Sequence, residues 1–325
     1  MLNLAYLPRF QRLVQTCDAY LLRCQLDEMH TRLLHRSLQQ LTRDFFRDKI
    51  IPALTFPALA WDVLGMPEHR DIDTLSAVHF LFYCFLDLTD DVEDQDLEGA
   101  LWEQLGEAAA INTGTSLLFL SLTLLEELEA SASVQLELHR QFTRAGFLLC
   151  AGQHRDLLSH RLPELEVEDA LTTHLLKTGS SVGLYLISTA TLARAPEEIK
   201  QAFYGLGQSL GVAAQIMGDW VDTREPWIPD FVNRCQSVPL LLLKEAASEA
   251  DAQYLKALEY QAKTRAEAHE IYRYLLQKYE VADRLNAHLR QYKQHAREYL
   301  RVLNQAGYDT GVFADFLERY REVSP

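Results

Sequence analysis

Residues 77–96 read AVHFLFYCFLDLTDDVEDQD, a mostly apolar segment that runs directly into a cluster of carboxylates. Residues 76–86 are apolar on nearly every side of a helix, which predicts a helix that is buried all round. The helical period then places five polar side chains on one face: Tyr83, Asp87, Asp90, Asp91 and Asp94. We therefore expect a carboxylate cluster at the mouth of an apolar interior.

Crowded carboxylates need compensating cations. They repel each other, and negative charge is disfavoured near a helix C-terminus. Mg²⁺ is a hard cation that binds carboxylate oxygens and shares its remaining positions with water and substrate phosphates. The alternative is a solvated acidic helix end, which the apolar lead-in disfavours. We predict Asp90, Asp91 and Asp94 as magnesium ligands.

Composition indicates one large helical domain over residues 1–325. The chain is 48% hydrophobic and has no Pro/Gly/Ser-rich linker. A net charge of −15 argues against nucleic acid or anionic lipid as the main partner. Its five cysteines form no CxxC pair, which is typical of a reducing cytosol, so we expect a cytoplasmic protein.

No segment is expected to insert stably in a membrane. The N-terminus lacks the basic and apolar regions of an export signal. The apolar runs at 76–86 and 117–125 are about half of the ~20 residues that a bilayer requires. They are expected to be core helices.

Helical periodicity extends along almost the whole chain. Residues 10–46 show it, and residues 241–304 contain neither Gly nor Pro. No run of short hairpin strands appears. Helix breaks are expected at Pro52 to Pro67, Gly106 to Gly114, Pro163, Pro196 and Pro226 to Pro239. The prediction is an all-α bundle of about ten to twelve helices around a central cavity.

Three later segments also carry groups of polar side chains. In GQHRDLL, Gln153 and Asp156 are one turn apart, and LLKTGSSVGLYL offers Lys177 and Thr178 before small residues. The third segment, AAQIMGDWVDTRE, presents three residues at i, i+4 and i+7: Gln215, Asp219 and Asp222. Taken singly, these are an ordinary polar face, a solvated lysine and a helix terminus. Together they can surround a magnesium-bound diphosphate.

The order of these motifs resembles the trans-isoprenyl diphosphate synthases, the class I isoprenoid enzymes. Residues 90–94 match the first DDxxD motif, and residues 152–157 and 177–179 match the GQxxDL and KT motifs. Residues 215–222 resemble the second aspartate motif, and residues 230–239 track the segment that follows it. The resemblance implies the isoprenoid synthase fold, two aspartate motifs facing each other across the cavity, two or three Mg²⁺ ions and a homodimer.

The departures from that pattern fall mainly where the family binds isopentenyl diphosphate. The usual GKRxRP segment reads RDKIIP at 47–52, Tyr83 replaces a histidine, and 95–99 replaces an Arg-Arg-Gly. In addition, Gly218 stands for the first aspartate of the second motif, and Cys235 stands for a lysine. The isopentenyl site therefore looks dismantled, and the third magnesium is in doubt unless Asp219 or Asp222 takes over.

A closer likeness within the superfamily is to the ComQ-type enzymes, which prenylate a tryptophan of a peptide. The DDVEDQD, GQHRD and QIMGDW runs all resemble them, including the glycine of the second motif. This likeness implies an allylic diphosphate substrate and an acceptor other than isopentenyl diphosphate.

The chemistry common to these enzymes is ionisation of the allylic diphosphate. Mg²⁺ at Asp90, Asp94 and the helix of Asp219 and Asp222 would neutralise the leaving diphosphate, assisted by Lys177. The candidate catalytic and substrate-binding side chains are Tyr83, Gln153, Arg155, Asp156, Lys177, Thr178, Gln215 and Arg224. Candidate rings for a carbocation pocket are Phe80, Tyr83, Phe119, Tyr185 and Trp220, although aromatic residues at helical spacing are more often core filling.

Three functions fit this pattern. The first is a terpene synthase that ionises a C15 or C20 diphosphate and quenches the cation by cyclisation, proton loss or water. The second is a prenyltransferase, either peptide-directed in the ComQ manner or a chain elongator that uses isopentenyl diphosphate. The third is a non-catalytic partner subunit, which the intact first motif disfavours.

Overall fold

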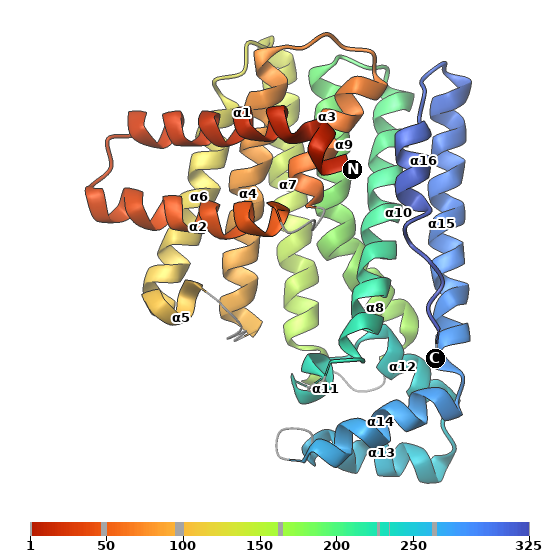
Figure 1. The fold of residues 1–325 in the computed structure, drawn as a ribbon. Coiled ribbons are helices and arrows are strands. Elements are labelled where there is room, and N and C mark those ends of the chain that lie inside the picture. The colour runs from red at the N-terminus through yellow and green to blue at the C-terminus, as the bar shows by residue number, and fades with distance from the viewer. Residues whose placement is uncertain are drawn as a thin grey trace. The chain divides into compact units, whose positions relative to one another are not determined.

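The computed structural model describes residues 2–46, 51–94, 101–161, 165–225, 228–233, 235–261 and 265–324. Every regular element within these ranges is helical, which confirms the all-α prediction (Figure 1). The helices are divided more finely than expected, because short pieces such as α5 (Leu101–Leu105) and α11 (Pro229–Asn233) separate longer ones.

Two compact units make up the chain, and each is described here by itself. One unit holds Met1–Thr143 with Tyr185–Lys200, and the other holds Arg144–Leu184 with Gln201–Pro325. The expectation of a single domain over 1–325 stays a prediction. Helices α7 (Ala132–Leu157), α9 (Ser180–Leu192) and α10 (Glu197–Asp222) contribute residues to both units.

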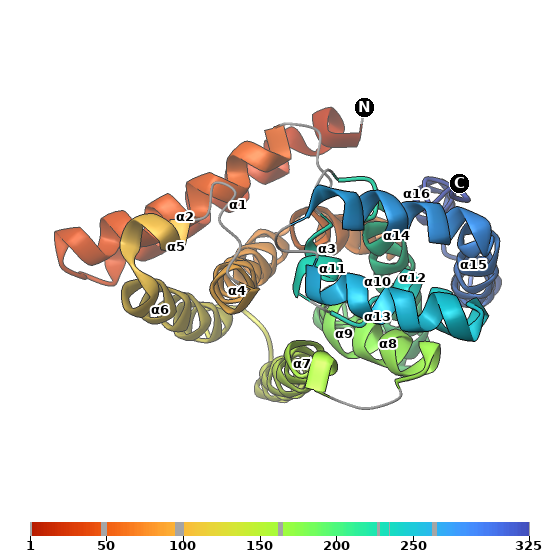
Figure 2. The same cartoon turned by 90° about the horizontal axis from the view of Figure 1, so that it is seen from below.

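The first unit is organised around α4. Its helices, besides α5, are α1 (Leu2–Arg23), α2 (Glu28–Phe46), α3 (Pro52–Val63), α4 (Arg70–Asp94) and α6 (Glu107–Leu125). Helix α4 packs against α1, α2, α3 and α6 (Figure 2). Every residue from Thr74 to Phe82 is buried, as expected for a helix enclosed on all sides.

The expected break between Pro52 and Pro67 is confirmed in part, because residues 64–69, around Pro67, are not helical, whereas residues 52–63 are. Helix α3 begins at Pro52 and continues through Pro57 to Val63. A proline in the first turn loses no intrahelical hydrogen bond, since those N–H groups have no helical partner. Pro57 removes a single donor, and burial of the surrounding residues compensates for it: nine consecutive residues, 53–61, are buried.

Helices α4 and α6 are long and apolar enough to cross a membrane by length and composition alone. Buried core helices meet the same test, and the apolar window of α4 is 67% buried against 39% for α6. Phe119 on α6 was expected to line an apolar pocket. That expectation is wrong, because the residue is 62% exposed. The absence of stable membrane insertion stays a prediction.

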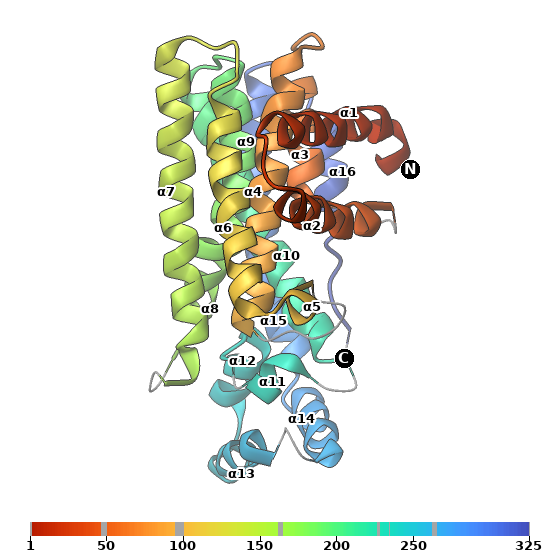
Figure 3. The same ribbon diagram turned by 90° about the vertical axis from the view of Figure 1, so that its left-hand side faces the viewer.

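The second unit has its own core. Its elements are η1 (Ser159–Arg161), α8 (Val167–His174), the π-helix η2 (Leu175–Gly179), α11, α12 (Val238–Ala246), α13 (Glu249–Gln261), α14 (Ala266–Lys278), α15 (Val281–Gln305) and α16 (Gly311–Leu317). Helix α13 lies beside α14 (Figure 3), and α12 packs on α8, α14 and α15. Apolar side chains of α10, α12 and α15 fill the interior, and Phe231 stacks on Tyr272 at 4.6 Å between ring centroids. This core fixes the C-terminal end of α10, where the second aspartate motif lies.

Candidate active site

The first aspartate motif occupies the last turns of α4, in the first unit. Asp90 and Asp91 are half-buried, and Asp94, the last residue of the helix, is exposed. Tyr83 lies about two turns earlier and is half-buried. Burial and the negative charge of Asp87 raise the pKa of Tyr83 well above its usual value, so its phenol is neutral. The motif thus combines carboxylates with a neutral hydroxyl and no cationic group of its own.

An aromatic cluster surrounds the buried part of α4. His79 is fully buried, stacks on Phe142 and meets the edge of Tyr185, with 5.0 Å between ring centroids in both pairs. The His79 Nε2 atom lies 2.8 Å from Ser188 Oγ. Burial lowers the pKa of His79 to about 3, so the ring is neutral. Phe80 is also fully buried, so the sequence-predicted rings Phe80 and Tyr185 are both core residues of this unit.

The second unit brings together Lys177 and Thr178 with the GQxxDL helix and α10. Both residues lie on η2, and π-helical turns inserted in α-helices are frequent at functional sites. Two glycines hold this turn closely. A Cβ atom on Gly152 of α7 would lie 2.8 Å from Lys177 N, and one on Gly211 of α10 would lie 2.6 Å from Thr178 O. Side chains at these glycines would force the helices apart, so η2 is clamped between α7 and α10.

Two side-chain contacts link the predicted residues across this clamp. Lys177 Nζ donates to Asp156 Oδ2 at 2.6 Å, and Thr178 Oγ1 donates to Gln215 Oε1 at 2.8 Å. The side-chain amide atoms of Gln153 are buried, with no hydrogen-bond partner among the described residues. A buried amide without a partner costs free energy. Gln153 is therefore suited to a ligand.

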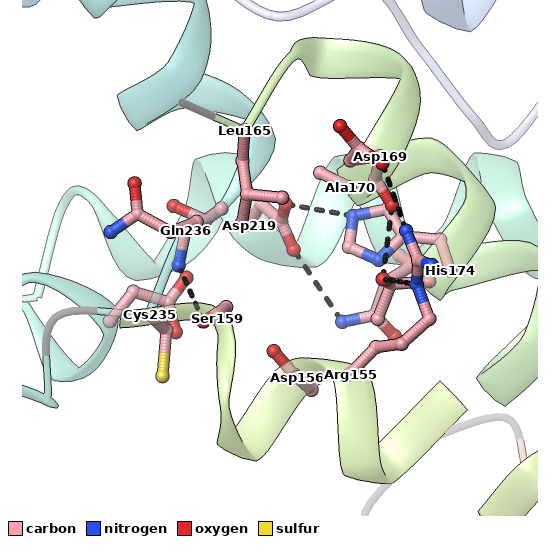
Figure 4. A pocket seen from close by; sticks show the side chains of 14 residues that line it. Arg155, Asp156, Ser159, Leu165, Asp169, Ala170, His174, Asp219, Cys235 and Gln236 are labelled. Carbon is pink, nitrogen blue, oxygen red and sulfur yellow. Dashed lines mark hydrogen bonds and ion pairs between the residues drawn. The ribbon is translucent and has the colours of Figure 1, made fainter. Parts of the chain in front are cut away.

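Asp219 sits at the junction of three elements (Figure 4). Its carboxylate is 4% exposed. Its Oδ2 atom lies 2.9 Å from His174 Nε2, at the end of α8, and accepts the Val238 N–H at 3.1 Å, at the start of α12. Its Oδ1 atom lies 3.5 Å from Gln215 Nε2. Sequence reasoning missed His174, although it lies three residues before Lys177.

Carboxylates accumulate around the end of α10. Burial raises the pKa of Asp222 to about 6, assisted by the charges of Asp219 and Glu225. Burial also raises the pKa of Asp230 well above its usual value, together with Asp219, Asp222 and Asp156. A cavity of about 50 Å³ lies beside this cluster, lined in part by Asp156, Asp219 and Asp230 (Figure 4). From the sequence, Asp230 was only the first residue of the segment that follows the second aspartate motif, and no role was predicted for it.

The two candidate arginines have partners of their own. Arg155 pairs with Asp169 at 3.0 Å and lies 3.4 Å from Thr173 Oγ1, while the exposed Arg224 donates to the Ser324 backbone oxygen at 2.6 Å. Arg155 therefore contacts α8, and Arg224 contacts the C-terminal tail. Either arginine would have to leave its present partner to bind a diphosphate. Their predicted catalytic role stays a prediction.

The side chains near the two aspartate motifs show how well the described residues fit a magnesium ion. In the part of the chain that the structure describes, no group of three or more His, Cys, Asp or Glu side chains is arranged to hold a metal ion. Burial, and after it the negative charge of neighbouring carboxylates, raises the pKa values of Asp222 and Asp230, and a bound cation would offset both effects. At Gly218, a Cβ would meet no atom within 4 Å. The metal roles of Asp90, Asp91, Asp94, Asp219 and Asp222 stay predictions.

Some of the departures seen in the sequence lie outside the described residues. These are residues 47–50 of the first isopentenyl segment and residues 95–99 of the third. Of the three departures from the isopentenyl site, only that at Tyr83 lies wholly within the residues that the structure describes.

The chain belongs to the polyprenyl synthetase family, whose sequence pattern it matches over residues 51–275. This membership makes it a prenyltransferase-type enzyme acting on allylic diphosphates. Among curated proteins it is 24% identical to the tryptophan prenyltransferase ComQ of Bacillus subtilis (strain 168), over 70% of this chain and 74% of that protein.

Solved structures share the fold at low sequence identity. A geranylgeranyl pyrophosphate synthetase from Geoglobus acetivorans superposes with a TM-score of 0.79 at 17% identity, covering 97% of this chain and 99% of the other. A polyprenyl synthase from Caulobacter crescentus CB15, complexed with calcium and isoprenyl diphosphate, gives 0.75 at 17% identity, covering 97% and 98%. These likenesses confirm the isoprenoid synthase fold. None of them supports the terpene synthase function placed first from sequence, whereas the prenyltransferase alternative fits.

Proposed function

We propose that this protein is a Mg²⁺-dependent prenyltransferase that ionises an allylic diphosphate of 15 or 20 carbons and transfers the prenyl group to an acceptor other than isopentenyl diphosphate. Membership of the polyprenyl synthetase family supports the allylic substrate. A cytoplasmic homodimer is part of the proposal.

Ionisation requires the leaving diphosphate to be neutralised. Asp90 and Asp94 on α4, with Asp222 on α10, would hold the metal ions, and bound Mg²⁺ would supply Lewis-acid stabilisation of the departing diphosphate. Lys177 would donate hydrogen bonds to the same group. Its ammonium has three donors, and the bond to Asp156 fixes its direction from the clamped η2 turn. A pre-positioned donor stabilises developing charge without reorganisation during the reaction.

The observation that carries the acceptor proposal is Tyr83. The family places a histidine here to hold isopentenyl diphosphate, whereas this chain has a phenol whose pKa is raised by burial and by Asp87. A neutral hydroxyl beside carboxylates offers an incoming diphosphate no positive charge. The apolar and aromatic surroundings of α4 suit instead an uncharged acceptor and protect a carbocation from water. The similarity to a tryptophan prenyltransferase supports an indole as that acceptor.

A peptide assay tests this proposal. The full chain is incubated with farnesyl or geranylgeranyl diphosphate, Mg²⁺ and a library of tryptophan-containing peptides, and products are identified by mass spectrometry. The matched control replaces each tryptophan with phenylalanine. We expect a mass increase of one prenyl group on tryptophan peptides alone.

The other functions are distinguishable outcomes of the same assay. A hydrocarbon or alcohol formed at the same rate with and without peptide would indicate a terpene synthase. A product lengthened by isopentenyl diphosphate would indicate a chain elongator. No diphosphate release under any condition would indicate a non-catalytic subunit.

A further inference from the structure

The carboxylate of Asp219 already accepts contacts from donors of the protein, which a metal ligand would have to give up. One carboxylate oxygen faces two donors, His174 Nε2 at 2.9 Å and Val238 N at 3.1 Å, and the other faces Gln215 Nε2 at 3.5 Å. The side chain is 4% exposed. Coordination of a cation by Oδ2 would compete with both short contacts and leave a buried N–H without a partner.

The contacts of Asp219 join the elements that carry the predicted substrate-binding residues. His174 is the last residue of α8, and η2 with Lys177 and Thr178 follows immediately. Gln215 extends the same network, because it contacts Asp219 through Nε2 and accepts the Thr178 hydroxyl through Oε1. Asp219 therefore fixes both ends of the segment from His174 to Thr178 on α10.

Asp222 has the opposite environment. It lies one turn later on α10, is half-buried, and is crowded by the negative charges of Asp219 and Glu225. Gly218, on the preceding turn, leaves open space beside the helix. A cation near this part of α10 would meet the carboxylate of Asp222, whereas that of Asp219 is occupied by donors of the protein.

We propose that Asp219 is a positioning residue that anchors the Lys177 and Thr178 turn through His174, Val238 and Gln215, and that Asp222 is the metal-binding carboxylate of the second motif. The metal part of this inference rests on the proposed function, whereas the anchoring part does not. It revises the expectation that both Asp219 and Asp222 bind magnesium. The second motif then supplies one metal-binding carboxylate, so fewer protein ligands hold the metal ions than the family pattern implies.

Asparagine distinguishes the two roles at these positions. At 219, its amide oxygen can still accept from His174 and Val238, so the two short anchoring contacts are retained, and only the 3.5 Å contact from Gln215 Nε2 is lost. At 222, the same substitution removes the formal charge that a hard divalent cation requires. Alanine at 219 removes every anchoring contact.

The experiment measures metal binding and stability separately on the full-length protein. Mn²⁺ binding is followed by electron paramagnetic resonance of free Mn²⁺, and melting temperatures are measured in EDTA. The variants are Asp219→Asn, Asp219→Ala and Asp222→Asn, with Glu225→Gln as the matched control at an exposed residue just past the end of α10. Allylic diphosphate turnover is measured as a function of Mg²⁺ for each variant.

We expect Asp219→Asn and Glu225→Gln to keep Mn²⁺ affinity within about twofold, and Asp222→Asn to weaken it by about tenfold, because only the last loses a ligand charge. Asp219→Ala should lower the melting temperature by about 4–10 °C, as loss of several buried hydrogen bonds requires, and Asp219→Asn should restore most of it. In turnover, Asp219→Asn should leave the Mg²⁺ concentration for half-maximal rate unchanged.

Equal loss of Mn²⁺ affinity in Asp219→Asn and Asp222→Asn would overturn the inference, and so would a wild-type melting temperature in Asp219→Ala. If Asp219→Ala does not fold, the asparagine variant still decides the metal role. If the wild-type protein binds no Mn²⁺, the proposed function fails, and the melting temperatures still decide whether Asp219 is an anchor.

Discussion

Replacing Asp222 with asparagine should stabilise the metal-free protein while it weakens magnesium binding. Burial, with Asp219 and Glu225 nearby, raises the pKa of Asp222 from its usual 3.8 to about 6. The folded state therefore binds more protons than the unfolded state between these values, so the free energy of unfolding decreases as pH rises through that window. Above pH 6 the ionised carboxylate carries its full cost, which asparagine avoids.

The size of the effect follows from the pKa difference. A change from 3.8 to about 6 corresponds to about 3 kcal/mol at most, and solvent screening of a half-buried group reduces this to about 1–1.5 kcal/mol. We expect Asp222→Asn to raise the free energy of unfolding by this amount at pH 8, and by about half as much at pH 5. The measurement is urea unfolding in EDTA at both pH values, followed by circular dichroism.

Glu225→Gln is the control, because an exposed substitution usually changes stability by less than about 0.5 kcal/mol. Equal or lower stability of Asp222→Asn at pH 8, or a gain of the same size at pH 5 and pH 8, would refute the reasoning. A stabilising change that also raises the Mg²⁺ requirement would mark Asp222 as a residue kept for function at the expense of stability.

Three further predictions concern the aspartate motifs and the lysine. Asp90→Ala or Asp94→Ala should abolish diphosphate release without lowering the melting temperature, since each change relieves repulsion at a helix C-terminus; undiminished turnover would contradict the magnesium assignment. Lys177→Met should slow turnover by at least about tenfold and Lys177→Arg by less, because only arginine keeps a charged donor; equal rates in stopped-flow diphosphate release would exclude a role in leaving-group stabilisation. Gly218→Asp should increase Mn²⁺ affinity, since a Cβ there meets no atom within 4 Å and the new carboxylate joins the turn before Asp222; unchanged Mn²⁺ binding in a folded variant would show that this side of α10 does not face the metal.

The sequence predicted the elements that depend on local patterning. The apolar segment before Asp87 forms the buried middle of α4, and the lysine, glutamine and aspartate motifs of the second unit meet as the family resemblance implied. The hydrophobic period is sufficient for the first result because it is a property of one helix, whereas the second result depends on the order of the motifs along the chain.

The sequence could not predict features that depend on contacts between distant segments. Asp219 receives its donors from His174 and Val238, which lie 45 and 19 residues away along the chain. Pro57 is tolerated inside α3 because its surroundings are buried, and Phe119 is exposed because of how α6 packs. Such partners are set by tertiary packing, which a periodicity does not encode.

The central claim is magnesium-dependent prenyl transfer without chain elongation, and one incubation tests it most directly. The protein is supplied with geranyl, farnesyl or geranylgeranyl diphosphate, Mg²⁺ and a tryptophan-containing peptide, with and without isopentenyl diphosphate, and both diphosphate release and product chain length are measured. We predict Mg²⁺-dependent release from the farnesyl or geranylgeranyl substrate that isopentenyl diphosphate neither accelerates nor converts to a longer product. Release that requires isopentenyl diphosphate and yields a product five carbons longer would contradict the account.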